Sequence, residues 1–241
     1  MPRHKGCGYV VLIRAVLLDI DDTLLSFEGC VRQTMREGLP AFGLGAYRED
    51  MYEVARRVNV RLWGQIECGE LDLAALEQVR WNTIFSELGL VGDGVAFERY
   101  FKERLFWSAV EVPGARELVE RLRGRVVLCA ASNGPNEQQV NRLRVAGMLD
   151  SFDHVFISER LGAEKPGREF FDACFAELGD IAPAETLIVG DSLTSDMAGG
   201  AAYGLRTCLY RPDAVAGEGF SGVDHVVTSL LEVPALLDRL G

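Results

Sequence analysis

The stretch LLDIDDTL, residues 17–24, comes directly after an apolar run. Its carboxylates Asp19 and Asp21 are one residue apart, so both leave the end of one predicted strand together. One such group can bind a metal ion and attack phosphorus, while the other protonates a leaving oxygen and later deprotonates water. The competing interpretation is a capping or turn cluster, because Asp is common at helix starts. We predict that role for Asp22, in the turn that leads away from the site.

Outward from this stretch, five apolar runs are typical of buried parallel strands. They are Arg14–Leu18, Val126–Ala131, His154–Ile157, Thr186–Val189 and Thr207–Tyr210. Helical patterns lie between them, at residues 113–124, 136–146, 168–178 and from Asp196 to Gly204. Strands that alternate with helices predict an α/β fold with a doubly wound, Rossmann-like parallel sheet.

Residues 27–106 interrupt this alternation. They contain helix-like segments such as Met51–Leu62 and Leu73–Leu88 and no comparable β-rich run. We therefore predict a mostly helical insertion at 27–106, with the sheet domain built from residues 1–26 and 107–241. The glycine-containing stretch Asp213–Gly222 is predicted to be a surface loop.

Two more polar motifs follow predicted strands or the loops after them. Ser132-Asn133-Gly134 offers a hydroxyl and backbone N–H groups that suit a phosphoryl oxygen, although a simple turn and helix cap would look the same. In Glu164-Lys165-Pro166, Lys165 is a compact positive charge that can neutralise carboxylate and phosphate oxygens, whereas an isolated lysine there would be a solvated loop residue.

A fourth motif, residues 190–196, begins with Gly190-Asp191 at a strand end and reaches Asp196 five positions later. Two such carboxylates suit direct and indirect magnesium binding, although Asp196 alone could be a helix cap. Because the carboxyl ends of strands in a doubly wound sheet converge on one crevice, we expect the four motifs to form one site.

The charge balance narrows the possible partners. The chain has 25 basic and 36 acidic side chains, a net charge of -11. An acidic surface disfavours nucleic acid polymers and anionic membranes as partners. A phosphate site in this chain must therefore reverse the field locally, through a metal ion, a lysine or helix N-termini.

Six scattered cysteines form no C-x-x-C pair, and the three histidines share no metal-ligand spacing. We expect reduced cysteines, Cys7 included, no zinc site and a cytoplasmic location. The apolar stretch Tyr9–Leu18 is interrupted by Arg14 and runs straight into Asp19. It is predicted to be a buried strand and not a targeting segment, and no run is long enough to span a membrane.

Taken in this order, the motifs D-x-D-x-T-L at 19–24, Ser132, Lys165 and G-D-x-x-x-x-D at 190–196 resemble the haloacid dehalogenase superfamily of hydrolases. The resemblance covers nearly the whole chain. The stretches 157–166 and 190–196 look most like the branch that includes pyrimidine 5′-nucleotidases.

The resemblance implies a Mg²⁺-dependent phosphomonoesterase. Asp19 would be the nucleophile that forms an aspartyl-phosphate, and Asp21 would act as general acid and then general base. The metal ligands would be Asp19, the backbone carbonyl of Asp21 and Asp191, with Asp196 in support. Phosphoryl transfer depends mainly on such positioning and electrostatic stabilisation.

The same resemblance assigns phosphate binding to Ser132, Asn133 and Lys165, and it makes residues 27–106 a helical cap domain. Closing a cap excludes water and adds substrate contacts. In the insertion, Arg56, Arg57 and Arg61 could reach a substrate, but a solvated helix face is the expected role. Seven aromatic residues in the insertion or directly after it are expected to be packing residues more than a stacking platform. They are Trp63, Trp81, Phe85, Tyr100, Phe101, Phe106 and Trp107.

The substrate is expected to be a small phosphorylated metabolite. Nucleoside 5′-monophosphates, sugar phosphates and other phosphomonoesters all remain candidates, and the oligomeric state is not readable from the sequence. Three alternatives share the fold: a phosphomutase, a metal-independent haloacid dehalogenase and a non-catalytic binding protein. Asp21 and the Asp191/Asp196 pair argue against the dehalogenase, and the complete motif set argues against the binding protein.

Overall fold

The computed structural model describes residues 12–215 and 218–240. Within them, parallel strands form one sheet in the order β3-β2-β1-β4-β5-β6. The strands are β1 (Ala15–Leu18), β2 (Val127–Ser132), β3 (His154–Ile157), β4 (Thr186–Gly190), β5 (Arg206–Tyr210) and β6 (His225–Val227). This arrangement confirms the predicted doubly wound α/β fold.

The centre of the sheet is fully buried. Every residue of β1 and β4 lies in the core, and Ala15 is in register with Val127 on one side and Thr186 on the other. A strand covered on both faces must be apolar throughout, which explains the continuous hydrophobic runs in the sequence. The site residues that follow β1 and β4 therefore start from the most constrained part of the fold.

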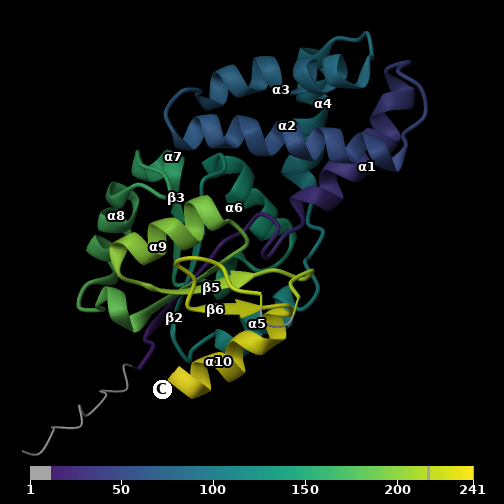
Figure 1. Cartoon of the computed structure of the whole chain (residues 1–241). Helices are drawn as coiled ribbons and strands as arrows, with labels where there is room; N and C mark the ends of the chain where they lie inside the picture. The colour runs from purple at the N-terminus through teal and green to yellow at the C-terminus, as the bar shows by residue number, and fades with distance from the viewer. Residues whose placement is uncertain (1–11, 216–217, 241) are drawn as a thin grey trace, which may run out of the picture.

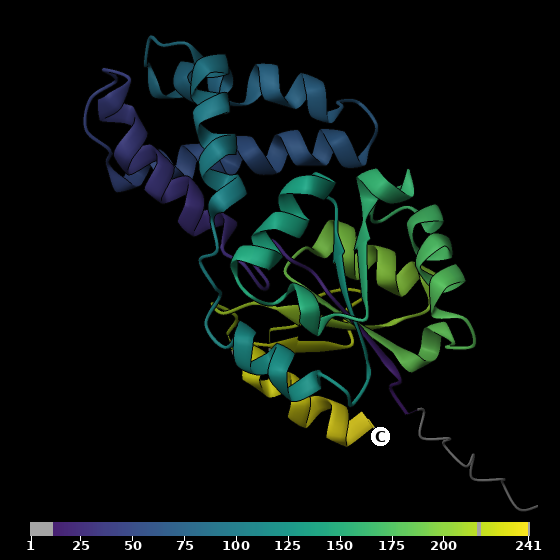
Figure 2. The same ribbon diagram turned by 180° about the vertical axis from the view of Figure 1, so that it is seen from behind.

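Helices cover both faces of the sheet (Figure 1, Figure 2). Alternate strand residues pack on one face with α5 (Ala115–Leu122), α6 (Asn136–Val145) and α10 (Val233–Leu240). The opposite face packs with α8 (Arg168–Leu178) and with the residues flanking α9 (Ala198–Tyr203). Short helical segments complete the core. They are α7 (Ser158–Leu161), the π-helical turn Leu193–Met197 and 3-10 turns at Leu149–Ser151, Pro183–Glu185 and Leu230–Glu232.

Four helices between β1 and α5 form a separate layer above the carboxyl ends of the strands (Figure 1). They are α1 (Phe27–Ala41), α2 (Glu49–Glu67), α3 (Leu73–Leu88) and α4 (Gly94–Trp107). Ser26, Asp72 and Asp93 cap α1, α3 and α4 through side-chain oxygens, as expected for these residue types. The layer has its own hydrophobic cluster, in which Trp81 packs against Phe97 with ring centroids 4.5 Å apart.

The predicted strands agree with the observed ones to within one residue at each end, but β6 was missed. This strand has only three residues and pairs only with β5 among the described residues, so its sequence carries too little periodicity to identify it. The described part of Asp213–Gly222 contains no helix or strand, as predicted for a surface loop. Cys7 and the start of the apolar stretch at Tyr9 lie outside the described residues, and the other five cysteines are free thiols.

Among residues 12–215 and 218–240, every helix is too short or too polar to traverse a lipid bilayer.

Candidate active site

Polar side chains from three neighbouring strands meet at one edge of the sheet. Asp19 follows β1, Ser132 ends β2 and Asp191 follows β4, and β1 lies between the other two. The chain winds outward in opposite directions from β1 and β4, which makes this the switch point where ligands bind in such sheets. The backbone N–H of Asp19 donates to Val189 O at 2.9 Å, so the residue is anchored to β4 beyond the end of the paired strands.

Lys165 is the centre of this cluster. Its side chain is only 1% exposed, and its Nζ donates to Oδ1 of Asp19 at 2.8 Å, to Oδ1 of Asp196 at 2.6 Å and to the carbonyl of Ala131 at 2.8 Å. All three ammonium hydrogens therefore have acceptors. The sequence predicted a charge-neutralising lysine here, and the structure places it against two carboxylates.

The carboxylates outnumber this one cation. Burial raises the pKa of Asp19 to about 7, and the charge of Lys165 opposes that rise. Burial, followed by the charges of Asp19 and Asp196, holds the pKa of Asp191 well above its usual range. For Lys165, burial lowers the pKa, but the two carboxylates outweigh it and raise the pKa above its ordinary value. When ionised, Asp19, Asp191 and Asp196 together carry more negative charge than Lys165 alone neutralises.

A bound cation would neutralise this excess negative charge. Asp19, Asp191 and Asp196 each offer a ligand atom, and these atoms lie within 4.8 Å of one another. Hard oxygen donors at this spacing suit Mg²⁺. Asp196 has both oxygens engaged, Oδ1 with Lys165 and Oδ2 with the backbone N–H of Ser192 at 3.2 Å. Asp19 and Asp191 are therefore the better candidates for direct ligands. Asp196 instead fixes the neighbouring Lys165 ammonium and the backbone of Ser192.

The turn that carries Asp196 packs directly on the end of β4. A Cβ atom added to Gly190 would lie 2.2 Å from Oδ2 of Asp196, closer than any side chain can approach. Only glycine at this strand end lets the carboxylate reach Lys165. The glycine of the G-D-x-x-x-x-D motif is therefore a packing requirement of the site.

Ser132 and Asn133 form the next side of the site. The Ser132 hydroxyl is buried and accepts from the backbone N–H of Gly134 at 3.0 Å. The Asn133 side chain binds the backbone of Lys165 in both directions, donating to its carbonyl at 2.7 Å and accepting from its N–H at 2.9 Å. The side chain of Asn133 therefore fixes the loop that carries Lys165. The group of Asn133 that could bind a phosphate is its backbone N–H.

The side chain of Asp21 contacts α6. Its Oδ1 is paired with the guanidinium of Arg142, and its Oδ2 accepts from Nε2 of Gln139 at 2.5 Å. Both α6 residues were missed in the sequence. The sequence did contain a signal for them. They are two polar residues three positions apart, so they share one face of the helix that follows Ser132-Asn133-Gly134. Packing alone would favour apolar residues on an inward-facing helix surface.

Helix α2 forms the side of the site opposite the carboxyl ends of the strands. Asn59, Trp63 and Glu67 lie four residues apart, so they share one helix face. They line a cavity of about 180 Å³ together with Asp19, Ser132, Lys165 and other core residues. Burial raises the pKa of Glu67, whose carboxyl faces Thr194. Asn59 and Glu67 were not singled out in the sequence, because their role depends on how α2 lies over the core.

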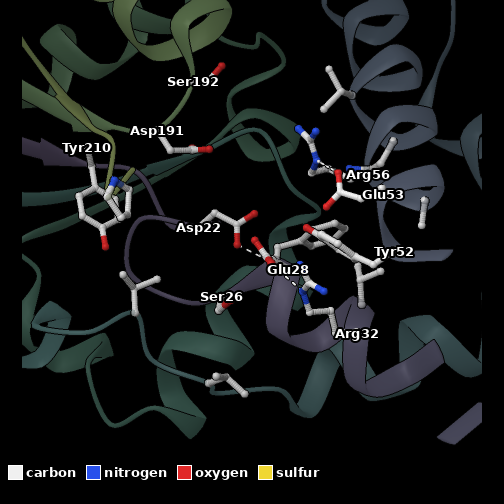
Figure 3. Close-up of a pocket in the computed structure, with 18 of the residues that line it drawn as sticks. Asp22, Ser26, Glu28, Arg32, Tyr52, Glu53, Arg56, Asp191, Ser192 and Tyr210 are labelled. Carbon is white, nitrogen blue, oxygen red and sulfur yellow. Dashed lines mark hydrogen bonds and ion pairs between the residues drawn. The ribbon is translucent and has the colours of Figure 1, made fainter. Parts of the chain in front are cut away.

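A larger cavity of about 1090 Å³ adjoins the site between α1, α2 and the sheet domain (Figure 3). Asp22 and Asp191 lie on its core side, and Tyr52, Glu53 and Arg56 lie on its helical side.

Oδ1 of Asp22 accepts from the backbone N–H of Glu28 at 2.9 Å, the turn role predicted for this residue.

The other residues singled out in the insertion either pack and pair within it or line one of the two cavities. Arg57 and Arg61 both pair with Glu87 on an exposed face at 2.9 Å, as expected for a solvated helix face. Arg56 pairs with Glu53 at 3.2 Å and lines the larger cavity. The aromatic residues divide in a similar way. Trp81, Phe85 and Phe101 are buried in the helical cluster, Trp63 lines the small cavity and Trp107 is exposed.

Known proteins show what this chain is similar to. The family description of haloacid dehalogenase-like hydrolases matches residues 13–204. The HAD-hydrolase YfnB of Bacillus subtilis is 31% identical over 83% of this chain and 85% of its own length. The pyrimidine 5′-nucleotidase PynA of Streptococcus pneumoniae is 31% identical over 93% and 94%. Human N-acylneuraminate-9-phosphatase is 27% identical over 95% of both chains.

Solved structures agree with the sequence relatives. A magnesium-bound crystal structure of YfnB matches with a TM-score of 0.84 and 28% identity, over 94% of this chain and 99% of that chain. The L-2-haloacid dehalogenase of Xanthobacter autotrophicus matches with a TM-score of 0.76 at 20% identity, over 95% and 100%, which shows a shared fold alone. With a family match over most of its length and relatives above 30% identity, the chain belongs to the haloacid dehalogenase-like hydrolases.

Proposed function

We propose that the protein is a Mg²⁺-dependent phosphomonoesterase that works through an aspartyl-phosphate on Asp19. The observation that carries this proposal is the buried contact of one ammonium, that of Lys165, with Asp19 and Asp196 at the switch point of the sheet. A carboxylate beside a buried cation is ready both to act as a nucleophile and to receive an anionic phosphoryl group.

In the first step, Asp19 attacks the phosphorus of the ester. Lys165 holds Oδ1, so Oδ2 is the proposed attacking oxygen. As the bond from Asp19 to phosphorus forms, the bond from phosphorus to the ester oxygen breaks. Asp21 gives its proton to that oxygen, and the product leaves as an alcohol.

In the second step, water replaces Asp19 on phosphorus. Asp21, now a carboxylate, takes a proton from the water as it attacks. The bond from phosphorus to Asp19 breaks, the Asp19 carboxylate is regenerated, and inorganic phosphate leaves. Asp21 holds the proton needed for the next cycle, so the two steps balance.

The transferring phosphoryl group would lie among three chain groups. These are the hydroxyl of Ser132, the backbone N–H of Asn133 and the ammonium of Lys165. Their positions around the small cavity support this assignment. Fixed donors of this kind stabilise developing charge without reorganising during the reaction.

The proposed ligands of Mg²⁺ are the carboxylates of Asp19 and Asp191 and the backbone carbonyl of Asp21, with Asp196 in support. The geometric support is the 4.8 Å cluster of Asp19, Asp191 and Asp196. When bound, the cation neutralises charge on the phosphoryl oxygens. The local excess of carboxylates, which would otherwise repel an anionic substrate, is consistent with this requirement.

We further propose that residues 27–106 act as a cap domain that receives the leaving group. Asn59, Trp63 and Glu67 of α2 face the small cavity, and the larger cavity gives space beyond it. The proposed substrate is a small phosphorylated metabolite, with nucleoside 5′-monophosphates as the first class to test. The similarity to PynA, a pyrimidine 5′-nucleotidase, and the aromatic ring of Trp63 support that choice.

The direct test is phosphate release from nucleoside monophosphates, sugar phosphates and an aryl phosphate, with Mg²⁺ and with EDTA. We expect release that EDTA abolishes and that favours pyrimidine monophosphates. A metal-dependent preference for other esters would keep the chemistry and reject the nucleotide substrate. Transfer of phosphate to a second substrate hydroxyl instead of water would indicate a phosphomutase. Chloride release from 2-chloropropionate without phosphate release would indicate a dehalogenase.

A further inference from the structure

Arg142 is a buried cation that the phosphatase chemistry does not by itself require. Its side chain is 0% exposed and contacts Oδ1 of Asp21, although it lies 121 residues away in the sequence. Burying a guanidinium costs free energy, and replacing a buried ion pair by apolar residues is often neutral for stability. Leu143, the next residue of α6, packs in the hydrophobic core, so an apolar side chain could also be buried at this place. The buried charge therefore calls for an explanation other than stability.

Gln139, one helical turn before Arg142, binds the other oxygen of the same carboxylate. Its Nε2 donates to Oδ2 of Asp21 at 2.5 Å and to Oγ of Ser132 at 2.8 Å, and its Oε1 accepts from Nη1 of Arg142 at 3.0 Å. The two side chains thus brace each other, and each oxygen of Asp21 accepts one hydrogen bond from them. The second lone pair of each oxygen stays available for a transferable proton. The contact with Ser132 fixes Asp21 relative to the phosphate-binding loop.

Arg142 is also tied to the segment that follows α4. Its Nε donates to the carbonyl of Ser108 at 3.3 Å, and the adjacent Asn141 donates to the carbonyl of Phe106 at 2.8 Å. The guanidinium is therefore positioned by the backbone on one side and by Gln139 on the other. A side chain held in this way can impose an orientation on its partner.

We propose that Arg142 and Gln139 are positioning residues that aim the carboxyl group of Asp21 at the leaving oxygen. The inference rests on the proposed function, in which Asp21 transfers that proton. Asp21 lies beyond the end of β1, so its side-chain torsions are not fixed by strand pairing. Proton transfer requires the acid within hydrogen-bond reach of the oxygen, and a displacement of about 1 Å can cost about 100-fold in rate.

The test compares two substrates whose leaving groups differ in their need for a proton. An alkyl phosphate leaves as a strongly basic alkoxide unless it is protonated, whereas nitrophenolate leaves without that help. We measure kcat/KM, which reports the steps through the first irreversible one, for each ester with wild type, Arg142→Met, Gln139→Met and Arg142→Lys. Arg144→Met is the matched control, because Arg144 is an exposed arginine of the same helix.

We expect both methionine variants to lose about 100-fold in kcat/KM for the alkyl ester and less than about tenfold for the nitrophenyl ester. Arg142→Lys should recover part of the alkyl activity, and Arg144→Met should match wild type on both esters. In an Asp21→Asn background, Arg142→Met should change neither value further, because the group it positions is gone.

An equal loss on both esters would overturn the inference, since a merely structural role damages both reactions alike. If Arg142→Met fails to fold, Gln139→Met carries the comparison, because methionine keeps nearly the volume of glutamine and removes its donors. If wild type shows metal-dependent phosphate release and the variants lose the same factor in kcat/KM on both esters, only the positioning role is overturned. No metal-dependent release from either ester would overturn the proposed function and this inference with it.

Discussion

Oδ1 of Asp19 and Nζ of Lys165 lie 2.8 Å apart, although the two residues are separated by 146 positions in the sequence. The same ammonium reaches Asp196 at 2.6 Å, so it compensates two buried carboxylates at once. Removing one partner of a buried ion pair leaves an uncompensated charge, which costs far more than the pair gains. Lys165 is therefore expected to matter for the stability of the fold as well as for the reaction.

The first prediction concerns Lys165→Met. We expect phosphate release to fall at least about 100-fold, because a fixed cation at the phosphoryl group is lost. We also expect the free energy of unfolding in EDTA, measured with urea, to fall by about 3 to 5 kcal/mol. Mg²⁺ should restore part of that stability, since it neutralises the same carboxylates.

The control is Arg125→Met, which removes an exposed ion pair to Asp238 and should cost about 0 to 1 kcal/mol. A Lys165→Met protein as stable and as active as wild type would contradict the assigned role of the ammonium.

The second prediction concerns Gly190→Ala. The added methyl group would meet Oδ2 of Asp196 at 2.2 Å and must displace it, and with it the contact to Lys165. We expect a loss of stability of about 1 to 3 kcal/mol, as for overpacking in a core, and a large loss of phosphate release. Gly64→Ala is the control, because nothing lies within 4 Å of a Cβ atom there and alanine favours a helix interior. Wild-type activity in a folded Gly190→Ala protein would show that Asp196 can move without consequence.

The sequence was sufficient to predict strands β1 to β5 and the order of the motifs that follow them. Runs such as those before Asp19 and Asp191 are continuous in apolar residues because β1 and β4 are buried on both faces. Parallel strands bring their carboxyl ends together, so polar residues after them could be placed in one site without coordinates. Even Lys165, in a short Lys-Pro loop, was found through the motifs around it.

Other features depend on how helices are oriented, which local sequence does not determine. The contact of Arg142 with Asp21 requires α6 to turn a polar face inward, against the usual amphipathic pattern. Asn59 reaches the site only because α2 lies over the edge of the sheet, an arrangement made by packing between distant segments. The three residues of β6 are recognisable as a strand only through their pairing with β5.

The third prediction addresses the proposed cap. Asn59→Ala removes an amide that lines both cavities, so it should change the relative kcat/KM values among nucleoside and sugar monophosphates by about tenfold. The requirement for Mg²⁺ should stay the same, because the carboxylate cluster is untouched. Arg57→Ala, on the exposed side of the same helix, should leave the ranking of substrates as in wild type. An unchanged ranking in Asn59→Ala would argue against α2 as the surface that selects the leaving group.

The fourth prediction separates the two carboxylates of the first motif. Asp19→Asn should reduce phosphate release from every ester to the uncatalysed level, because no other group replaces the nucleophile. Asp21→Asn should lower release from alkyl phosphates by about 100- to 10,000-fold, the usual contribution of a general acid. The residual first turnover should be larger with a nitrophenyl ester than with an alkyl ester. Normal turnover by a well-folded Asp19→Asn protein would rule out the proposed mechanism.

The most direct test of the central claim is to identify the residue that carries phosphate during turnover. The enzyme is mixed with Mg²⁺ and a good substrate, quenched in acid, and treated with borohydride, which reduces an acyl phosphate to an alcohol. Peptide mass spectrometry then locates the reduced residue. The account predicts homoserine at position 19, found only with substrate and lost in Asp19→Asn. Turnover with an unmodified Asp19, or with reduction at another carboxylate, would contradict it.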